Sequence, residues 1–144
     1  MEVEFHTGID DKLVFACRLL RKAYLKGAQV AVTGAPDWLA RLDQALWSFE
    51  PYEFVPHARL ARGAVAPPRL ARTPLWLLEP GATPPHREVL VNLGPNLADD
   101  YADFARVIEI VARDAPDREA GRQRWRAYEA AGVGIKHHAQ ATGA

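Results

Sequence analysis

Apolar residues near the amino terminus follow first a two-residue period and then a helical one. Val3 and Phe5 alternate with charged neighbours, which predicts a short strand. After Asp10 and Asp11, either of which can cap a helix, apolar residues recur every three or four positions up to a stop at Gly27. These apolar residues are Leu13, Cys17, Leu20 and Tyr24. The pattern predicts a strand followed by an amphipathic helix.

The same order then repeats. Residues 29–33 are rich in β-branched side chains, residues 34–36 form a turn signal, and Asp37 can cap a second helix. The apolar residues of that helix are Leu39, Leu42, Leu46 and Trp47. Short apolar runs at 75–78 and 89–93 predict later strands. Because a right-handed crossover brings each parallel strand beside its neighbour, this order predicts an α/β fold with a mainly parallel sheet and helices on both faces.

Proline and glycine interrupt the pattern in the middle of the chain, so residues 58–73 and 80–87 are predicted to be loops. Beyond them, Asp99 or Asp100 is expected to cap a third helix. The apolar residues of that helix would be Phe104, Val107, Ile108 and Val111.

A last helix is predicted between a cap at Asp117 and a stop at Gly132. The residues that follow are small and polar and have no periodicity. We therefore expect one α/β domain over residues 1–133 and a flexible carboxyl-terminal tail over residues 134–144.

Charge and composition exclude several classes of partner and site. The 144 residues contain 18 basic and 18 acidic side chains, so no global field attracts nucleic acid or an anionic membrane. A single cysteine, Cys17, excludes an internal disulfide. The amino terminus lacks the features of a signal peptide, and no apolar run approaches the length of a membrane span, so we expect a cytoplasmic protein.

The sequence offers no convincing catalytic or cofactor site. The turn Thr33–Pro36 has one glycine, whereas a dinucleotide loop needs three, and Asp37 at the helix start would repel a phosphate. Ser48 has no nucleophile context. The acidic group around Asp99 is explained by helix capping, and the histidines lack the spacing of a tetrahedral metal site. We expect no enzyme activity, no cofactor and no metal.

Aromatic side chains cluster after the second predicted helix. They are Trp47, Phe49, Tyr52 and Phe54, with Pro51 and Pro56 stiffening the connection. Some of them should fill the core. The excess over what a turn needs is typical of an exposed hydrophobic site for a partner protein.

The last helix carries arginine and tryptophan on one face. Arg118, Arg122, Trp125 or Arg126, and Glu129 are spaced three or four residues apart. A guanidinium beside an aromatic ring can receive a carboxylate together with a hydrophobic side chain, so an acidic peptide that ends in an aromatic residue would fit. The alternative is a solvated basic face with Trp125 packed inward.

A third feature is a loop with four cations and no acid. Its cations are Arg59, Arg62, Arg69 and Arg72. Nucleic acid could bind there. However, residues 58–73 contain no aromatic side chain on which a base could stack, which disfavours a single-strand binder.

Several segments carry a family resemblance when taken together and in order. They are LDQALW at 42–47, FVPH at 54–57, DF at 103–104, RQRWRAY at 122–128 and AG at 131–132. With these segments, the chain resembles end to end the chi subunit family of the bacterial DNA polymerase III holoenzyme, which is associated with the clamp loader. The resemblance implies a Rossmann-like three-layer fold without nucleotide binding or catalysis of its own.

The resemblance also implies partners. Chi binds the psi subunit and, separately, the acidic carboxyl-terminal tail of single-stranded DNA-binding protein, so its association with DNA is indirect. A helicase is thought to compete for the psi surface, and chi alone is expected to be a monomer. Two rival functions stay open, namely a small Rossmann-like nucleotide-binding enzyme and a direct single-stranded DNA binder.

Site residues follow from the same resemblance, position by position. Trp47 and Phe54 match the aromatic positions at the psi surface. Arg122 matches the arginine that receives the tail carboxylate, and the positions around it are Val111, Arg118, Trp125 and Arg126. Lysine in place of Arg118 and tyrosine in place of Trp125 are found in the family, and both changes keep the chemistry.

Overall fold

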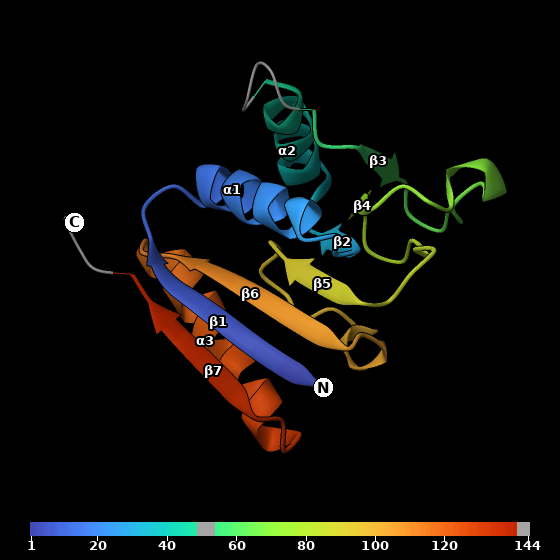
Figure 1. Cartoon of the computed structure of the whole chain (residues 1–144). Coiled ribbons are helices and arrows are strands. Elements are labelled where there is room, and N and C mark those ends of the chain that lie inside the picture. The colour runs from blue at the N-terminus through green and yellow to red at the C-terminus, as the bar shows by residue number, and fades with distance from the viewer. Residues whose placement is uncertain (49–53, 141–144) are drawn as a thin grey trace.

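The computed structural model describes residues 1–48 and 54–140 and contains one seven-stranded sheet in the order β3-β4-β2-β5-β6-β1-β7 (Figure 1). Every neighbouring pair of these strands is parallel. The strands are β1 Glu2–Ile9, β2 Val30–Thr33, β3 His57–Leu60, β4 Leu75–Leu78, β5 Val89–Asn92, β6 Arg106–Ala112 and β7 Ile135–Ala139. The helices are α1 Lys12–Leu25, α2 Pro36–Ser48 and α3 Ala115–Ala130, with 3-10 turns at Pro68–Leu70 and Tyr101–Asp103.

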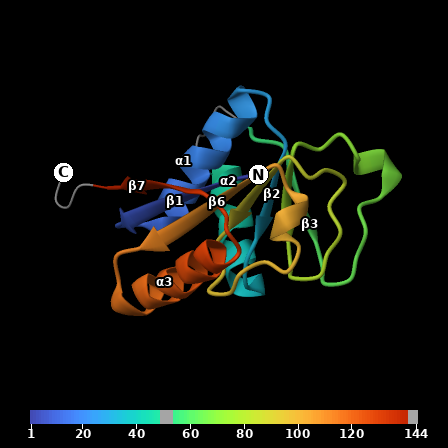
Figure 2. The same ribbon diagram turned by 90° about the horizontal axis from the view of Figure 1, so that it is seen from below.

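The helices form two layers, one on each side of the sheet. α1 and α2 cover one face and share a hydrophobic core with alternate residues of β2, β4 and β5. α3 lies on the opposite face, behind β6, β1 and β7 in Figure 1 and below the sheet in Figure 2. This arrangement confirms the predicted α/β fold with a parallel sheet and helices on both faces.

One predicted helix is wrong. Residues 104–111 do not form a helix but supply most of β6, which follows the short turn Tyr101–Asp103. β6 is buried from Val107 to Ala112 because helices cover both faces of the sheet there. A strand buried on both faces needs a continuous apolar run rather than an alternating one, and such a run can mimic a buried helix.

Smaller differences concern the ends of elements. Asp11 caps α1, as predicted, by accepting a hydrogen bond from the Val14 amide at 3.1 Å. Asp37 and Asp117 are not caps, because α2 begins at Pro36 and α3 is capped by Asp114, so each aspartate lies in the first helical turn. Both positions still favour an acidic side chain, since the helix dipole is positive there.

Two strands lie where the sequence predicted irregular structure. β3 takes the first residues of the predicted loop 58–73 and pairs with β4 at one edge of the sheet. β7 takes residues of the predicted tail and pairs with β1 at the other edge, from Val3–Ile135 to Thr7–Ala139. Edge strands need only one pairing partner and have a weak apolar pattern, which explains why periodicity misses them.

Candidate functional site

Helix α3 presents two kinds of side chain on opposite faces. Arg124 and Tyr128 point into the protein and are buried, at 2% and 0% exposure. Arg118, Arg122 and Arg126 follow one another at four-residue intervals and are exposed. Residues four apart share a helix face, so one short motif supplies both an anchor to the sheet and a row of cations.

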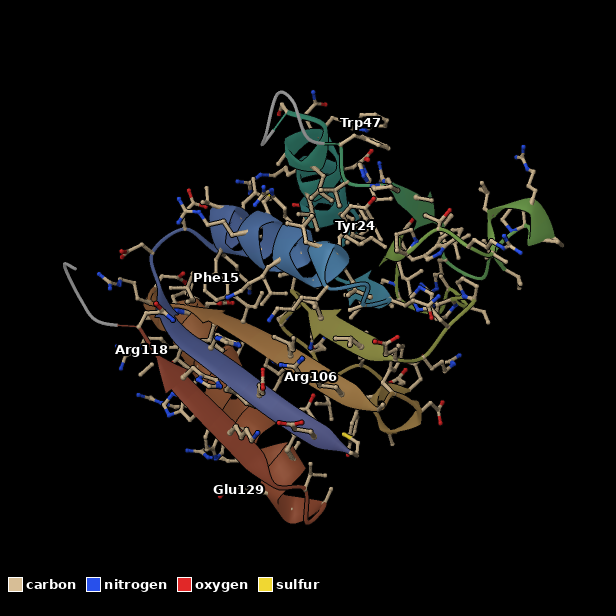
Figure 3. The ribbon with its side chains drawn as sticks, in the orientation of Figure 1. Phe15, Tyr24, Trp47, Arg106, Arg118 and Glu129 are labelled. Atoms are coloured by element: carbon tan, nitrogen blue, oxygen red, sulfur yellow. The ribbon has the colours of Figure 1, made fainter. Side chains whose placement is uncertain are left out.

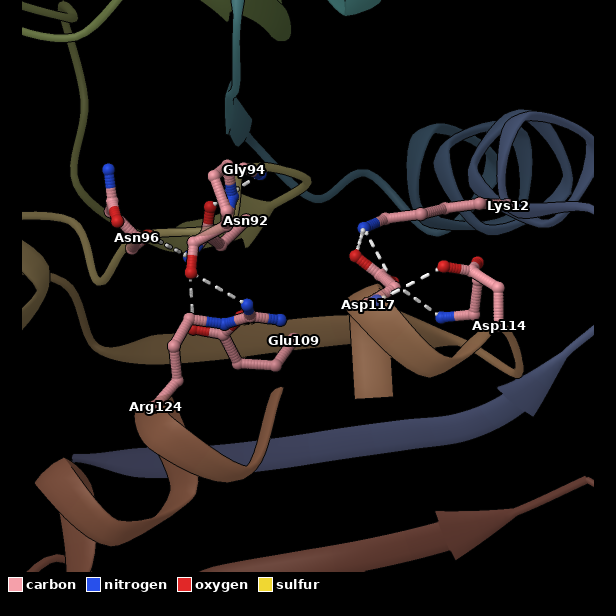
Figure 4. Close-up of polar contacts among 10 residues, drawn as sticks. Lys12, Asn92, Gly94, Asn96, Glu109, Asp114, Asp117 and Arg124 are labelled. Carbon is pink, nitrogen blue, oxygen red and sulfur yellow. Dashed lines mark hydrogen bonds and ion pairs between the residues drawn. The ribbon is translucent and has the colours of Figure 1, made fainter. Parts of the chain in front are cut away.

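The inward face is held by a buried polar network around Glu109 of β6. Figure 4 shows Arg124 and Asn92 beside Glu109: Arg124 donates to it from Nε at 2.8 Å, and Asn92 donates from Nδ2 at 3.2 Å. Tyr128 donates to Glu109 from its hydroxyl at 2.7 Å. Arg124 also donates from Nη1 to the Pro95 carbonyl at 2.9 Å. Burial raises the pKa of Glu109, and the three donors oppose that rise. The network sets the rotation of α3 about its own axis.

A second contact places the amino-terminal end of α3. The buried Lys12 ammonium lies 3.1 and 3.2 Å from the Asp117 carboxylate oxygens (Figure 4). Asp117 also accepts a hydrogen bond from the Ala112 amide at 2.7 Å. In addition, a side chain at Gly121 would place its Cβ 2.8 Å from Cγ2 of Val111, so only glycine permits this close approach of helix and strand.

The outward face of α3 forms one wall of a cavity of about 840 Å³. The family resemblance assigned five residues to binding the tail of single-stranded DNA-binding protein, and all five line this cavity. They are Val111, Arg118, Arg122, Trp125 and Arg126. β1 and β7 provide the opposite wall. Figure 3 shows Arg118 and Glu129 toward the two ends of the helix. The structure therefore brings together residues that the sequence separates into a strand and a helix.

Aromatic rings form the apolar part of this cavity. The Trp125 ring lies 4.9 Å from the Phe5 ring, centroid to centroid, and 5.3 Å edge-on from the His137 ring. His137 in turn shares a hydrogen bond of 2.7 Å with the Thr7 hydroxyl. Trp125 is only partly buried, so its ring borders the cavity while it packs against the sheet.

The cavity is strongly cationic. Among the described residues that line it are four arginines, one of them Arg113, and a single acidic residue, Glu129. Arg113 is already paired with Asp10 at 2.8 Å, and Arg122 lies 3.5 Å from Glu119. The Arg122 side chain is 58% exposed, so this contact is weak and a stronger anion can replace it. The cavity can hold an apolar ring next to a carboxylate.

Sequence reasoning missed the wall opposite α3. Phe5, Thr7 and Gly8 of β1, Arg113 after β6 and His137 of β7 line the cavity. These residues come from both ends of the chain and meet only because β1 lies between β6 and β7. Alternation along β1 could have indicated which of its residues face α3, but nothing local shows that β7 exists.

The second predicted surface is an exposed aromatic pair at the end of α2, labelled at Trp47 in Figure 3. Trp47 and Phe54 are 61% and 53% exposed, and their rings stack with centroids 4.9 Å apart. His57 packs against this pair, with its ring edge-on to Trp47 at 5.2 Å between centroids. Its Nε2 lies 2.7 Å from the Asp43 carboxylate. Phe49 and Tyr52 lie outside the described residues.

The remaining sequence features offer less. The turn 33–36 borders a cleft of about 540 Å³ whose lining includes Glu79 and Asp99. Arg87 also lines this cleft, but it is paired with Asp100 at 2.8 Å. Such a lining disfavours a phosphate.

The arginines of the basic loop are exposed, and Arg59 lies 3.9 Å from Asp43. Donor groups suited to a metal ion lie elsewhere, where β1 and β7 run side by side. In the described part of the chain, no helix is both long and apolar enough to cross a bilayer.

Comparisons with known proteins identify the family. A family model described as DNA polymerase III chi subunit, HolC, matches residues 1–136. The chain is 34% identical over 128 residues to DNA polymerase III subunit chi of Pseudomonas aeruginosa. The matched stretch covers 88% of this chain and 85% of that protein. The chain is 27% identical over 122 residues to the subunit of the same name in Escherichia coli, covering 83% and 79%. The chain therefore belongs to the DNA polymerase III chi subunit family.

Proposed function

We propose that this protein bridges two partners in the replication machinery: the psi subunit and the acidic carboxyl-terminal tail of single-stranded DNA-binding protein. Its family makes it an accessory subunit of DNA polymerase III. The bridging role would place a polymerase subunit on DNA that is already coated by its binding protein, in the cytoplasm. On its own the chain would be a monomer without catalytic activity.

One observation carries the tail-binding half of this proposal: the cationic cavity beside α3. A terminal carboxylate would pair with Arg122, and an aromatic side chain beside it would pack against Val111 and Trp125. Arg118 and Arg126 lie along the same helix face, where they would attract acidic residues upstream in the tail. A short peptide loses conformational freedom on binding, so we expect a total of roughly 7 to 8 kcal/mol, which corresponds to micromolar affinity.

The exposed pair Trp47 and Phe54 supports the psi-binding half. Large aromatic side chains near one another on a surface are typical of protein interfaces. α2, which carries Trp47, and α3, which borders the cavity, lie on opposite faces of the sheet. One partner therefore need not displace the other, which a bridging subunit requires. A helicase that used the aromatic pair would compete with psi.

Tail binding can be tested with a fluorescent acidic peptide that ends in phenylalanine. Fluorescence anisotropy across a salt series should show micromolar binding that weakens as salt rises, because ion pairs contribute. Arg122→Ala should abolish it. Arg69→Ala is the matched control, since Arg69 is also exposed but lies in the basic loop, away from the cavity. An equal loss in both variants would show attraction by overall charge and contradict the assigned site.

Psi binding can be tested by co-elution of purified psi with the wild-type chain and with Trp47→Ala. Trp47 is exposed, so the variant should stay folded and lose psi. Val65→Ala is the control, because Val65 is 69% exposed on another part of the surface. Retention of psi by the Trp47 variant would contradict this half of the proposal. Stabilisation by a nucleotide, or binding of an oligonucleotide without a protein partner, would instead favour the rival functions.

A further inference from the structure

The sheet has a strip of polar side chains where its first strand, β1, pairs with its last strand, β7. On the side away from α3, β1 presents Glu4 and His6, and β7 presents His138. Figure 1 shows β1 and β7 side by side with no helix in front of them. His6 and His138 are register partners in the parallel pair, so two imidazole rings are held next to each other by the backbone.

The donor atoms of these three residues lie close together. One ligand atom from each of Glu4, His6 and His138 is within 4.8 Å of the other two. His6 Nε2 lies 3.6 Å from a Glu4 oxygen, and the rings of His6 and His138 stack with centroids 4.8 Å apart. Tetrahedral coordination with bonds near 2 Å needs donor atoms about 3.4 Å apart, a small further approach. The exposed His138 ring can make that movement by rotating.

The orientation of the His6 ring decides which of its nitrogens could bind a metal ion. Nε2 lies 3.6 Å from the Glu4 carboxylate, whereas Nδ1 is buried and has no hydrogen-bond partner among the described residues. The ring lies between Phe15 of α1, at 5.4 Å from centroid to centroid, and the stacked ring of His138. Nε2 is therefore the His6 atom that a metal ion beside Glu4 would use.

Cationic side chains near the group oppose a bound metal ion. Arg106 of β6 donates to Oε2 of Glu4 at 2.7 Å. The shortest contacts of Arg106 and His6 with Glu4 are both to Oε2, so Oε1 is the oxygen that a metal ion could take while the guanidinium keeps Oε2. Arg18 and Lys22 of α1 line the adjacent cavity of about 480 Å³ and add to the positive field. The repulsion lowers the affinity but leaves the ligand positions intact.

We propose that Glu4, His6 and His138 form a binding site for a divalent transition-metal ion of the zinc type. Two imidazoles and one carboxylate are a ligand set that zinc accepts, with the fourth position left to water. The ligands come from two neighbouring strands, so the ion would fasten the edge strand β7 to β1. Sequence spacing cannot show this site, because His6 and His138 are 132 positions apart.

The site can be tested by titrating the full-length chain with Co²⁺ and following the visible absorption of tetrahedral cobalt, then displacing it with Zn²⁺. We expect one equivalent to bind in the micromolar range. His138→Ala should weaken binding tenfold or more, since even outer-sphere partners of a metal ligand contribute roughly 10 to 100-fold. Because His138 is exposed, this variant should fold normally.

His137→Ala is the matched control, because His137 is the adjacent histidine but lies on the opposite face of the sheet, next to Trp125. It should bind cobalt like the wild type. As a second readout, Zn²⁺ should slow amide hydrogen exchange over residues 135–139 in the wild type and not in His138→Ala. No binding at micromolar metal, equal loss in both histidine variants, or unchanged binding in His138→Ala would overturn the proposal.

Discussion

Substitution of two arginines of α3 that are two residues apart should have different effects, one on the stability of the fold and the other on binding. Arg124 is 2% exposed and donates to the fully buried Glu109, whereas the side chain of Arg122 is 58% exposed above the cavity. We therefore compare Arg124→Met with Arg122→Met, since methionine keeps an unbranched apolar side chain but removes the guanidinium, with its charge and its hydrogen-bond donors. The first should destabilise the fold, and the second should affect only binding.

The expected magnitudes differ several-fold. Removal of Arg124 leaves the Glu109 carboxylate buried without its cation, and breaking such a pair costs about 3–5 kcal/mol of unfolding free energy. Tyr128 and Asn92 still donate to Glu109, which places the estimate at the lower end of that range. Arg122 loses only a solvent-exposed contact of 3.5 Å to Glu119, worth about 0–1 kcal/mol.

Urea unfolding of both variants at pH 7 and pH 5 measures these differences. Burial raises the pKa of Glu109 above 4.5, and Arg124 opposes that rise, so its loss raises the pKa further. An acid with a raised folded-state pKa adds stability below its unfolded-state pKa, and this stability is lost as the pH rises through the folded-state value. Arg124→Met should therefore be more damaging at pH 7 than at pH 5.

The double variant Arg124→Met, Glu109→Gln provides the control, because it removes both charges. It should recover part of the stability lost in Arg124→Met, as contacting residues couple in a double-mutant cycle. The reasoning is refuted if Arg124→Met costs no more than Arg122→Met, or if its effect is the same at both pH values.

Three further predictions concern the core and the buried titratable groups. Gly121→Ala should lower the unfolding free energy by about 1–2 kcal/mol, because the added Cβ would lie 2.8 Å from Val111. Val111→Ala in the same chain should relieve that clash, and urea unfolding of the single and double variants checks both expectations. Burial lowers the pKa of His6 and of His86, so the unfolded chain takes up protons more readily, and stability should fall as the pH drops below about 6.5; urea midpoints that stay constant between pH 7.5 and 5 would contradict this. Burial raises the pKa of Cys17 to about 11, so a thiol reagent at pH 8 should label the native chain only as fast as it opens; immediate labelling would show that the thiol is accessible.

Periodicity predicted the fold well where one face of an element meets water. The stripe of α1 and the buried leucines of α2 were read correctly, because a half-exposed helix keeps polar residues on its outer face. It failed at residues 104–111, where β6 is covered on both faces and Glu109, the polar residue within its apolar run, is buried, so exposed polar positions do not mark the strand period. It also missed β7, since four of its five residues are exposed and its partner, β1, lies at the other end of the chain.

The candidate sites divide in the same way. Helical spacing alone places Arg118, Arg122 and Trp125 on one face of α3, and the structure agrees. Spacing could not distinguish the inward Arg124 from its outward neighbours, because that depends on where Glu109 lies on β6. Nor could it supply Phe5 or the histidines of β7.

By itself, then, the sequence of this protein determined α1, α2 and α3, the strands β1, β2, β4 and β5, and the chemical character of α3, because these follow from local spacing of side chains. The tertiary structure alone decided what faces α3 across the cavity and which histidines meet on the other side of the sheet. Those contacts join residues more than 100 positions apart, such as Phe5 with Trp125 and His6 with His138. They depend on the order of strands in the sheet, which no local pattern encodes.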